Sequence, residues 1–165
     1  MMQKIYPTLW FDGNAEQAVN FYVNVFKNSS VGDKSYYTEE GKDIHKMDAG
    51  KILTIEFKLE GHEFLALNAG PEFKFNEAVS FVVSCNTQEE IDYYWNALSA
   101  HPESEQCGWL KDKFGLSWQV APTILPKLIQ SKDPEKSKRV MQAMMKMVKF
   151  DIKTLEDAAT SEVVG

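Results

Sequence analysis

Side chains that bind metals or act as nucleophiles are scarce in this chain, and they do not gather in the sequence. The histidines His45, His62 and His101 stand beside a loop, a tight turn and a proline, so we expect each of them at the surface. Gly115 to Ser117 has a Gly-x-Ser order but lacks the rest of a nucleophile elbow. These residue types therefore indicate neither a metal centre nor a serine hydrolase.

The two cysteines, Cys85 and Cys107, are too few for a disulfide scaffold, and we expect reduced thiols. Cys85 alternates in step with Phe81 and Val83, so its side chain is expected to face a helix. A nucleophilic or redox pair is the open alternative.

Composition limits the class of protein. A chain of 165 residues that is 44% hydrophobic can bury one core, so one compact domain is expected. The net charge of −6 argues against nucleic acid as a partner. There is no apolar run of membrane-spanning length, and Met1 to Tyr6 lacks a signal peptide's apolar region, so we expect a cytoplasmic protein without membrane contact.

The first half of the chain alternates between strand and helix patterns. A strand is predicted over 5–11, with Ile5, Leu9 and Phe11 on one side. Asn14 and Gln17 have the spacing of a capping box at the start of a helix. The buried face of this helix is predicted as Ala15, Ala18, Val19, Tyr22, Val25 and Phe26. An antiparallel meander over 30–38, 52–60 and 62–68 follows, with a tight turn at Glu60 and Gly61.

The second half repeats this order. A strand over 80–85 leads to a capping box at Thr87 and Glu90, and the helix carries an apolar stripe of Ile91, Tyr94, Trp95 and Leu98. Strands over 105–110 and 116–121 are predicted, joined by a polar turn over 111–115. At an offset of 72 residues (81 − 9), Leu9 matches Phe81 and Val19 matches Ile91, which indicates two pseudo-symmetric halves.

The chain after Pro122 is helical in pattern. Helices are predicted over 123–130 and 135–149, the second capped by Asp133 with Pro134 at its first position, and a short one from Asp151 to Ala159. The methionine stripe of the second helix is expected to pack against the sheet or a neighbouring subunit, with a ligand surface or partner groove as the alternative. The fold class is therefore α+β, with a paired domain over 1–124, halves at about 4–70 and 78–122, and a helical extension over 125–165.

Three motifs carry a family resemblance: LNAGP at 67–71, CNTQEEIDYYW at 85–95 and CGWLKDKFGLSWQVAP at 107–122. They resemble the PhnB-like branch of the glyoxalase/bleomycin-resistance/dioxygenase (vicinal oxygen chelate) superfamily, often labelled 3-demethylubiquinone-9 3-methyltransferase. The resemblance implies paired βαβββ modules that form a cup-shaped mixed sheet, commonly in a homodimer. The methyltransferase label has no support in the sequence, which lacks a glycine-rich strand-to-helix turn for an adenosyl cofactor.

The resemblance also implies where a metal would lie, on the inward faces of the first and last strand of each half. Strand alternation predicts four inward rows: Tyr6, Thr8 and Trp10; Phe64, Ala66 and Asn68; Ser80, Val82 and Ser84; Ser117, Gln119 and Ala121. The positions of the relatives' ligands would hold Tyr6, Asn68, Val79 or Ser80, and Gln119, none of which is His, Cys, Asp or Glu. We therefore expect no metal and no cofactor.

Two functions follow as hypotheses. The first is binding of a small organic ligand in a pocket of Tyr6, Trp10, Asn68, Ser80 and Gln119, with the Trp10 indole stacking on a flat ligand or only filling the cup. The alternative is an enzyme (lyase, isomerase or dioxygenase type) that acts on a small oxygenated substrate, with or without a metal. The acidic run Glu39, Glu40 and Asp43 is a solvated loop or, alternatively, part of a lid.

Overall fold

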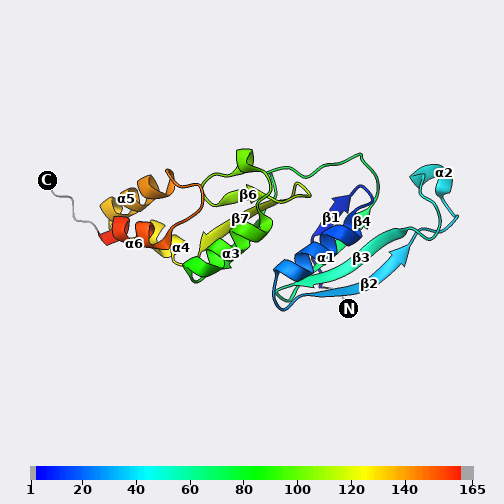
Figure 1. Ribbon diagram of the computed structural model, residues 1–165, viewed down its shortest axis with the longest axis horizontal. Coiled ribbons are helices and arrows are strands. Elements are labelled where there is room, and N and C mark those ends of the chain that lie inside the picture. Colours follow the sequence, from blue (N-terminus) through cyan, green and yellow to red (C-terminus); the bar gives the residue numbers. More distant parts are fainter. Residues whose placement is uncertain (1–2, 161–165) are drawn as a thin grey trace. The chain divides into compact units, whose positions relative to one another are not determined.

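The computed structural model describes residues 3–160, and the chain divides between Phe75 and Asn76 into two compact units (Figure 1). The N-terminal unit runs in the order β1 (Thr8–Phe11), α1 (Ala15–Val25), β2 (Ser30–Tyr36), α2 (Lys42–His45), β3 (Ile52–Leu59) and β4 (His62–Asn68). Its strands form one sheet in the order β1-β4-β3-β2. β1 lies parallel to β4, and the other pairs are antiparallel, so this sheet is mixed, as predicted.

Helix α1 covers one face of this sheet and forms the core of the unit with it (Figure 1). The predicted buried face of the helix is confirmed, since all six of its members are less than a tenth exposed. The sheet contributes alternate residues of three strands, each also buried: Leu9, Phe11, Ile55, Phe57, Leu59, Phe64 and Ala66. Each large apolar side chain removed from water in this way stabilises the fold by about 1.5–3 kcal/mol.

Two details at the start of the chain differ from the prediction. Strand β1 begins at Thr8, and Ile5 is 87% exposed, so its assignment to the core is wrong. Pro7 has no N–H to donate to a ladder, although its carbonyl accepts a bond from the Leu65 N–H at 3.0 Å. The side chain of Asn14 makes no capping bond, so the predicted capping box with Gln17 is also wrong.

The hairpin between β3 and β4 has the predicted tight turn. Glu60 and Gly61 both have positive φ, at 48° and 79°, as the two central residues of a type I′ turn require. The connection between β2 and β3 contains α2, and hydrogen bonds join its two ends. The Tyr37 N–H donates to the Lys51 carbonyl, and the Gly50 N–H donates to the Tyr37 carbonyl.

The C-terminal unit begins with β5 (Phe81–Cys85) and α3 (Gln88–Leu98) and continues through a 3-10 helix (Pro102–Ser104), β6 (Trp109–Lys111) and β7 (Ser117–Pro122). Its sheet has the order β5-β7-β6, with β5 parallel to β7. The Thr87 cap of α3 is confirmed, since the Glu90 N–H donates to Thr87 Oγ1 at 3.3 Å. The Glu90 carboxylate accepts at 2.6 Å from the N–H of Asn86, one residue before the cap, rather than from Thr87 itself.

The two units have the pseudo-symmetry that the repeat predicts. Leu9 in β1 and Phe81 in β5 lie in corresponding strands, because each strand leads into a helix and pairs in parallel with the last strand of its own sheet. The four-stranded and three-stranded mixed sheets make this an α+β fold, consistent with paired βαβββ modules. The expected strand over 105–110 is shorter, because Cys107 and Gly108 adopt positive φ and turn the chain before Trp109.

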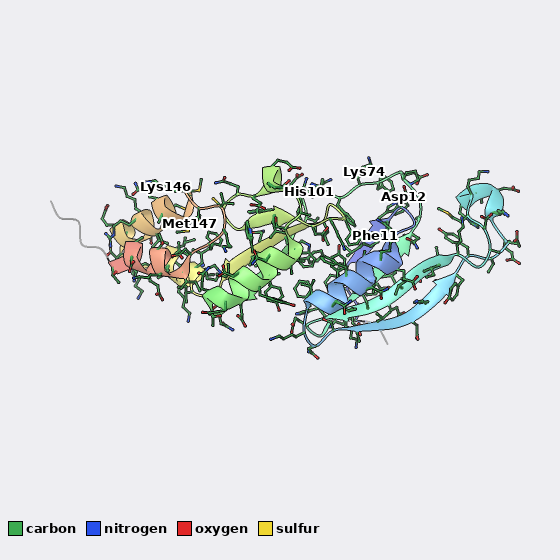
Figure 2. All side chains as sticks on the ribbon, in the orientation of Figure 1. Phe11, Asp12, Lys74, His101, Lys146 and Met147 are labelled. Atoms are coloured by element: carbon green, nitrogen blue, oxygen red, sulfur yellow. The ribbon has the colours of Figure 1, made fainter. Side chains whose placement is uncertain are left out.

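The C-terminal helices are α4 (Leu125–Ile129), α5 (Pro134–Met144) and α6 (Ile152–Thr160). The Asp133 cap of α5 is confirmed, since its Oδ1 accepts from the Glu135 and Lys136 N–H groups. Helix α5 does not extend to Lys149 as predicted. The carbonyls of Met147 and Val148 accept instead from the N–H groups of Cys107 and Gly108, at 3.0 and 2.8 Å, so this segment runs along the start of β6 (Figure 2).

Candidate functional site

Each sheet has one face covered by a helix and one open face, and the strand register assigns residues to them. In the N-terminal unit, Leu9 pairs with Ala66 and Phe11 with Asn68, so Asn68 lies on the face that α1 covers. Trp10 pairs with Leu67 and therefore lies on the opposite face. The prediction that puts Phe64, Ala66 and Asn68 on the inward row with Trp10 is wrong.

Asn68 has a structural role on the covered face. It is 7% exposed, and its Oδ1 accepts from the Ala15 N–H at 3.0 Å while its Nδ2 donates to the Ile52 carbonyl at 3.1 Å. The orphan N–H at the start of α1 is thus satisfied by a side chain from β4, which explains why Asn14 does not cap the helix. Both ends of the Asn68 amide are occupied within the core.

Trp10 and Tyr6 are placed differently from Asn68. The Trp10 indole is half-buried on the open face, with its Nε1–H donating to the Gly70 carbonyl at 2.8 Å and its ring edge-to-face with Phe73 at 4.9 Å. Tyr6 precedes β1 and is 36% exposed. Of the three predicted pocket residues in this unit, only Trp10 belongs to the open face of the sheet.

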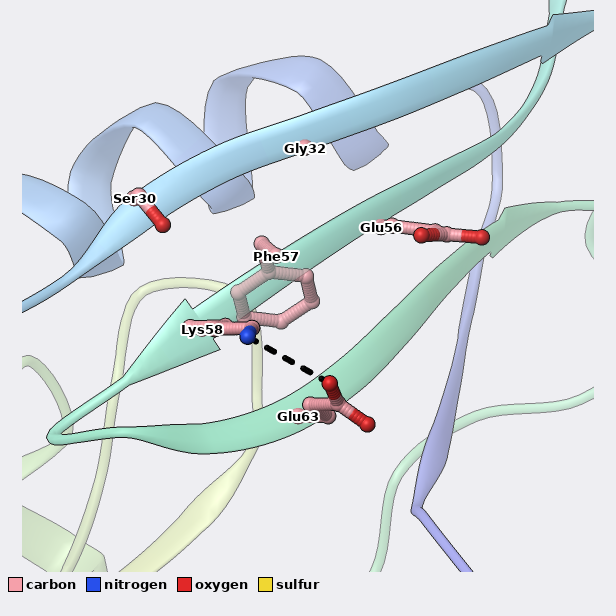
Figure 3. A pocket seen from close by; sticks show the side chains of 6 residues that line it. All are labelled: Ser30, Gly32, Glu56, Phe57, Lys58 and Glu63. Atoms are coloured by element: carbon pink, nitrogen blue, oxygen red, sulfur yellow. Dashed lines mark ion pairs between the residues drawn. The ribbon is translucent and has the colours of Figure 1, made fainter. Parts of the chain in front are cut away.

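A shallow hollow lies beside β2, β3 and β4 of the same unit (Figure 3). It is lined by Ser30, Gly32, Glu56, Phe57, Lys58 and Glu63. Figure 3 shows the ion pair of Lys58 and Glu63 across the ladder, with Nζ and Oε1 3.4 Å apart. The Gln3 N–H donates to the Glu63 carboxylate, and this bond holds the pKa of Glu63 below its usual value, with Lys58 adding to the effect. The hollow measures about 60 Å³, well below the roughly 300 Å³ of a small-molecule pocket.

The open face of the C-terminal sheet brings two predicted residues together. Gln119 Nε2 donates to Ser80 Oγ at 2.9 Å, which joins β7 to the residue before β5. Trp109 on β6 lies directly opposite Gln119 in the ladder and so shares its face. The carboxamide therefore stands between a hydroxyl and a half-buried indole. Within residues 3–160, the side-chain carbonyl oxygen of Gln119 accepts no hydrogen bond.

One end of this face carries a cation and a buried hydroxyl. Lys111 pairs with Ser117 across the β6–β7 ladder, and its ammonium forms an ion pair with Glu77. Ser117 is 1% exposed, and its Oγ is the one buried side-chain N or O atom, within residues 3–160, that has no hydrogen-bond partner. We call Ser80, Trp109, Lys111, Ser117 and Gln119 the β7 face.

A buried aspartate in the turn between β6 and β7 fixes the register of this hairpin from the sheet face opposite the β7 face. Asp112 is fully buried, and its Oδ1 accepts from the Phe114 and Leu116 N–H groups at 2.8 and 3.1 Å. Its Oδ2 accepts from Trp118 Nε1 at 2.8 Å, and the Trp118 side chain lies in the core. The turn that the sequence marks only as polar therefore fixes where Lys111 and Ser117 stand.

The donor atoms do not fit a divalent metal of the superfamily type. Within residues 3–160, no three His, Cys, Asp or Glu side chains stand close enough together to hold an ion. Asn68 is occupied by the core, and Gln119 directs its N–H at Ser80. Neutral amide and hydroxyl oxygens supply neither the charge nor the donor strength of carboxylate and imidazole ligands.

None of the five residues that make up the β7 face is a histidine or a cysteine. His45 is half-buried against the Tyr37 ring at 4.6 Å, rather than fully at the surface, and its Nδ1 accepts from the Met47 N–H. Cys85 is fully buried on the helix side, as predicted, and burial raises the pKa of its thiol to about 12. Such a thiol is not a nucleophile near neutral pH. Cys107 contacts the Met144 carbonyl at 3.5 Å.

Sequence reasoning left Trp109 and Lys111 unassigned. The strand before the 111–115 turn was expected to end at residue 110, which put Lys111 in the turn, whereas β6 covers Trp109–Lys111. With the turn placed at Asp112 to Gly115, the hairpin register pairs Trp109 with Gln119 and Lys111 with Ser117. Both residues then share the face of Gln119, so a correct placement of the turn would have assigned them.

Comparison with known proteins gives one family. Residues 3–121 match the family described as 3-demethylubiquinone-9 3-methyltransferase. A PhnB protein from Bacillus cereus, titled with the same methyltransferase name, is 35% identical, with a TM-score of 0.60 over 73% of this chain and 100% of that chain. Protein PA1353 from Pseudomonas aeruginosa is 19% identical, with a TM-score of 0.52 over 73% of this chain and 97% of that one, which shows the fold alone. No curated protein matches the chain.

Along residues 3–160, none of the helices combines the length and the apolar composition that crossing a bilayer requires.

Proposed function

The chain belongs to the PhnB-like family described as 3-demethylubiquinone-9 3-methyltransferase and has the glyoxalase-superfamily fold, and from this premise we propose that it binds a small organic molecule without a catalytic metal. The observation that carries the proposal is the hydrogen bond from Gln119 to Ser80 on the β7 face. It fixes the Gln119 carboxamide on the same face of the sheet as the Trp109 indole, which lies opposite it in the ladder. Directional polar groups next to a flat apolar surface are the usual lining of a small-molecule site.

The N-terminal sheet supports the same kind of chemistry on its own open face. The half-buried Trp10 indole is held by the Gly70 carbonyl and by Phe73, so a flat ligand would meet a ring in a fixed orientation. Asn68 is not part of this proposal, because its amide caps α1. Tyr6, four residues before Trp10 in the chain, is exposed and is part of the same proposal.

The experiment is a titration with benzamide, a planar neutral carboxamide, followed by amide NMR shifts. We expect the largest shifts at Ser80, Trp109 and Gln119. Gln119→Leu should weaken binding about two- to tenfold, because it removes one net hydrogen bond of about 0.5–1.5 kcal/mol. Gln142→Leu makes the same chemical change on the exposed side of α5 and should leave binding unchanged. Equal effects of the two variants, or shifts scattered away from the β7 face, would overturn the proposal.

We also propose that the protein acts as a cytoplasmic homodimer. Met141 on α5, and Met145 and Val148 after its end, are 39%, 60% and 45% exposed, whereas Val140 on α5 is fully buried. β2 is an edge strand with Val31 and Tyr36 exposed. Apolar side chains and unpaired strand edges of this kind are commonly covered by association. Sedimentation equilibrium should give twice the chain mass of 18.8 kDa, and the monomer mass at micromolar concentration would contradict it.

A further inference from the structure

We propose that the β7 face selects a small planar carboxylate, with Lys111 and Ser117 as its anion subsite and Glu77 as an internal competitor for Lys111. This inference rests on the proposed function and names its ligand class. It draws on three observations from the C-terminal unit: the donors on the face, the unpartnered hydroxyl, and the ion pair already formed there.

The β7 face carries one cation among neutral groups that can donate hydrogen bonds. Lys111 has three N–H donors, of which Glu77 engages one, Ser80 and Ser117 each carry an O–H, and Gln119 Nε2 has a second N–H beyond the one that it gives to Ser80. A carboxylate only accepts hydrogen bonds and carries a negative charge, so it is complementary to this set.

The hydroxyl of Ser117 has no use within the described fold. Most buried side-chain polar atoms have a partner, and each exception needs an explanation. Ser117 Oγ is buried, unpartnered and on the β7 face, next to Lys111 in the ladder. An alanine would fill the same place in the strand without the cost of an unpaired hydroxyl. A carboxylate oxygen that reaches Lys111 from this side gives the Ser117 O–H its acceptor.

The Glu77 carboxylate forms an ion pair with the Lys111 ammonium. The Lys111 side chain is 24% exposed and that of Glu77 is 63% exposed, and Glu77 belongs to the turn before β5. The hydrogen bond from Lys111 is the main reason that the pKa of Glu77 lies below its usual value. Because the Glu77 side chain is largely exposed, it can turn into water and leave the ammonium to an incoming carboxylate.

The test compares benzoate with benzamide, which have the same ring and differ in the anionic group, by calorimetry at low salt. We expect benzoate to bind about tenfold more tightly than benzamide, as a charge-assisted bond allows. Lys111→Gln should lower the benzoate-to-benzamide affinity ratio to about one. Lys113→Gln makes the same change two residues away and should preserve the preference.

Two further variants separate a binding role from a structural one. Glu77→Gln removes the competitor and should raise the benzoate-to-benzamide affinity ratio about two- to fivefold. Glu135→Gln is its matched control, because it also removes a carboxylate from an exposed ion pair of the same unit, here with Lys138. Ser117→Ala should weaken benzoate binding while the melting temperature stays equal or rises, because a structural hydroxyl would lower it on removal.

The outcomes distinguish the two levels of the proposal. If benzamide binds at the β7 face but benzoate binds no better, or if Lys111→Gln leaves the ratio unchanged, the carboxylate inference fails and small-molecule binding stands. If Glu77→Gln weakens benzoate binding in a protein that melts normally, Glu77 is not a competitor and the inference also fails. If neither compound shifts residues of the β7 face, the proposed function fails as well.

Discussion

Replacing Asn68 by alanine tests whether this residue holds the fold together or binds a ligand. The change removes the acceptor of the Ala15 N–H and the donor to the Ile52 carbonyl, which lie 3.0 and 3.1 Å from the amide. Ala15 is fully buried, so no water replaces the lost acceptor. A buried unsatisfied N–H costs about 1–3 kcal/mol, and losing the helix cap together with the second bond brings the total to about 2–4 kcal/mol.

Urea unfolding followed by circular dichroism measures this loss directly. With a slope of about 2 kcal/mol per molar urea, the midpoint of Asn68→Ala should fall by about 1–2 M. Asn24→Ala is the matched control, because Asn24 is exposed on α1 and bonds only to the Asn20 carbonyl of its own helix. Benzamide binding at the β7 face should be the same in both variants at urea-free conditions where both are folded.

A different result would refute this reasoning about Asn68. If the midpoint of Asn68→Ala matches that of Asn24→Ala, the amide does not cap α1. If, in addition, ligand binding is lost, Asn68 belongs to the pocket, as strand alternation alone predicts.

Three other predictions concern residues outside the β7 face. Gly108→Ala should destabilise the protein by about 2–4 kcal/mol in the same urea assay, because Gly108 has φ +81° and an added Cβ would lie 2.4 Å from the Phe150 ring. Gly50 has a similar φ and nothing within 4 Å of an added Cβ, so Gly50→Ala measures the cost of the backbone strain alone. Equal losses of stability in the two variants would contradict the clash with Phe150. Cys85 should resist a thiol reagent at pH 8 until the protein unfolds, since its pKa is about 12, and rapid labelling of Cys85 by peptide mapping would contradict its burial. Hydrogen bonds from Lys149 to Asp92 and from Thr154 to Asp151 lower the pKa of both carboxyls. Their contribution to stability is therefore present above the ordinary Asp pKa and is lost as the pH falls through the pKa values of the folded protein. The melting temperature should decrease below about pH 4, and Asp92→Asn should make this decrease smaller.

Local signals in the sequence predicted the parts of the fold that local chemistry decides. Thr87 caps α3 because its hydroxyl and the Glu90 N–H stand within one helical turn. Glu60 and Gly61 form the type I′ turn because glycine tolerates positive φ. Asn14 has the same kind of signal but does not cap α1, because the side chain of Asn68, distant in the chain, accepts from the Ala15 N–H at the start of the helix. Caps that come from another element cannot be read from spacing.

The sheet face on which each residue lies was predicted well where polar and apolar residues alternate and poorly where they do not. Ser117, Gln119 and Ala121 alternate with the buried Trp118 and Val120, so this row of β7 was evident. In β4 the residues between Phe64 and Asn68 are apolar on both faces, and alternation alone leaves two assignments. Only the register with β1 decides between them, and that register is a property of the folded sheet.

The most direct test of the account is a calorimetric titration of the chelator-treated protein with Zn²⁺, Mn²⁺, Ni²⁺ and Fe²⁺. The account predicts no stoichiometric binding by the unaltered protein, because the β7 face offers an amide and hydroxyls where a metal needs carboxylates or imidazoles. Gln119→Glu should gain affinity, since it places one ionised ligand on that face. Stoichiometric binding of any of these ions by the unaltered protein, lost in Gln119→Ala, would contradict the account.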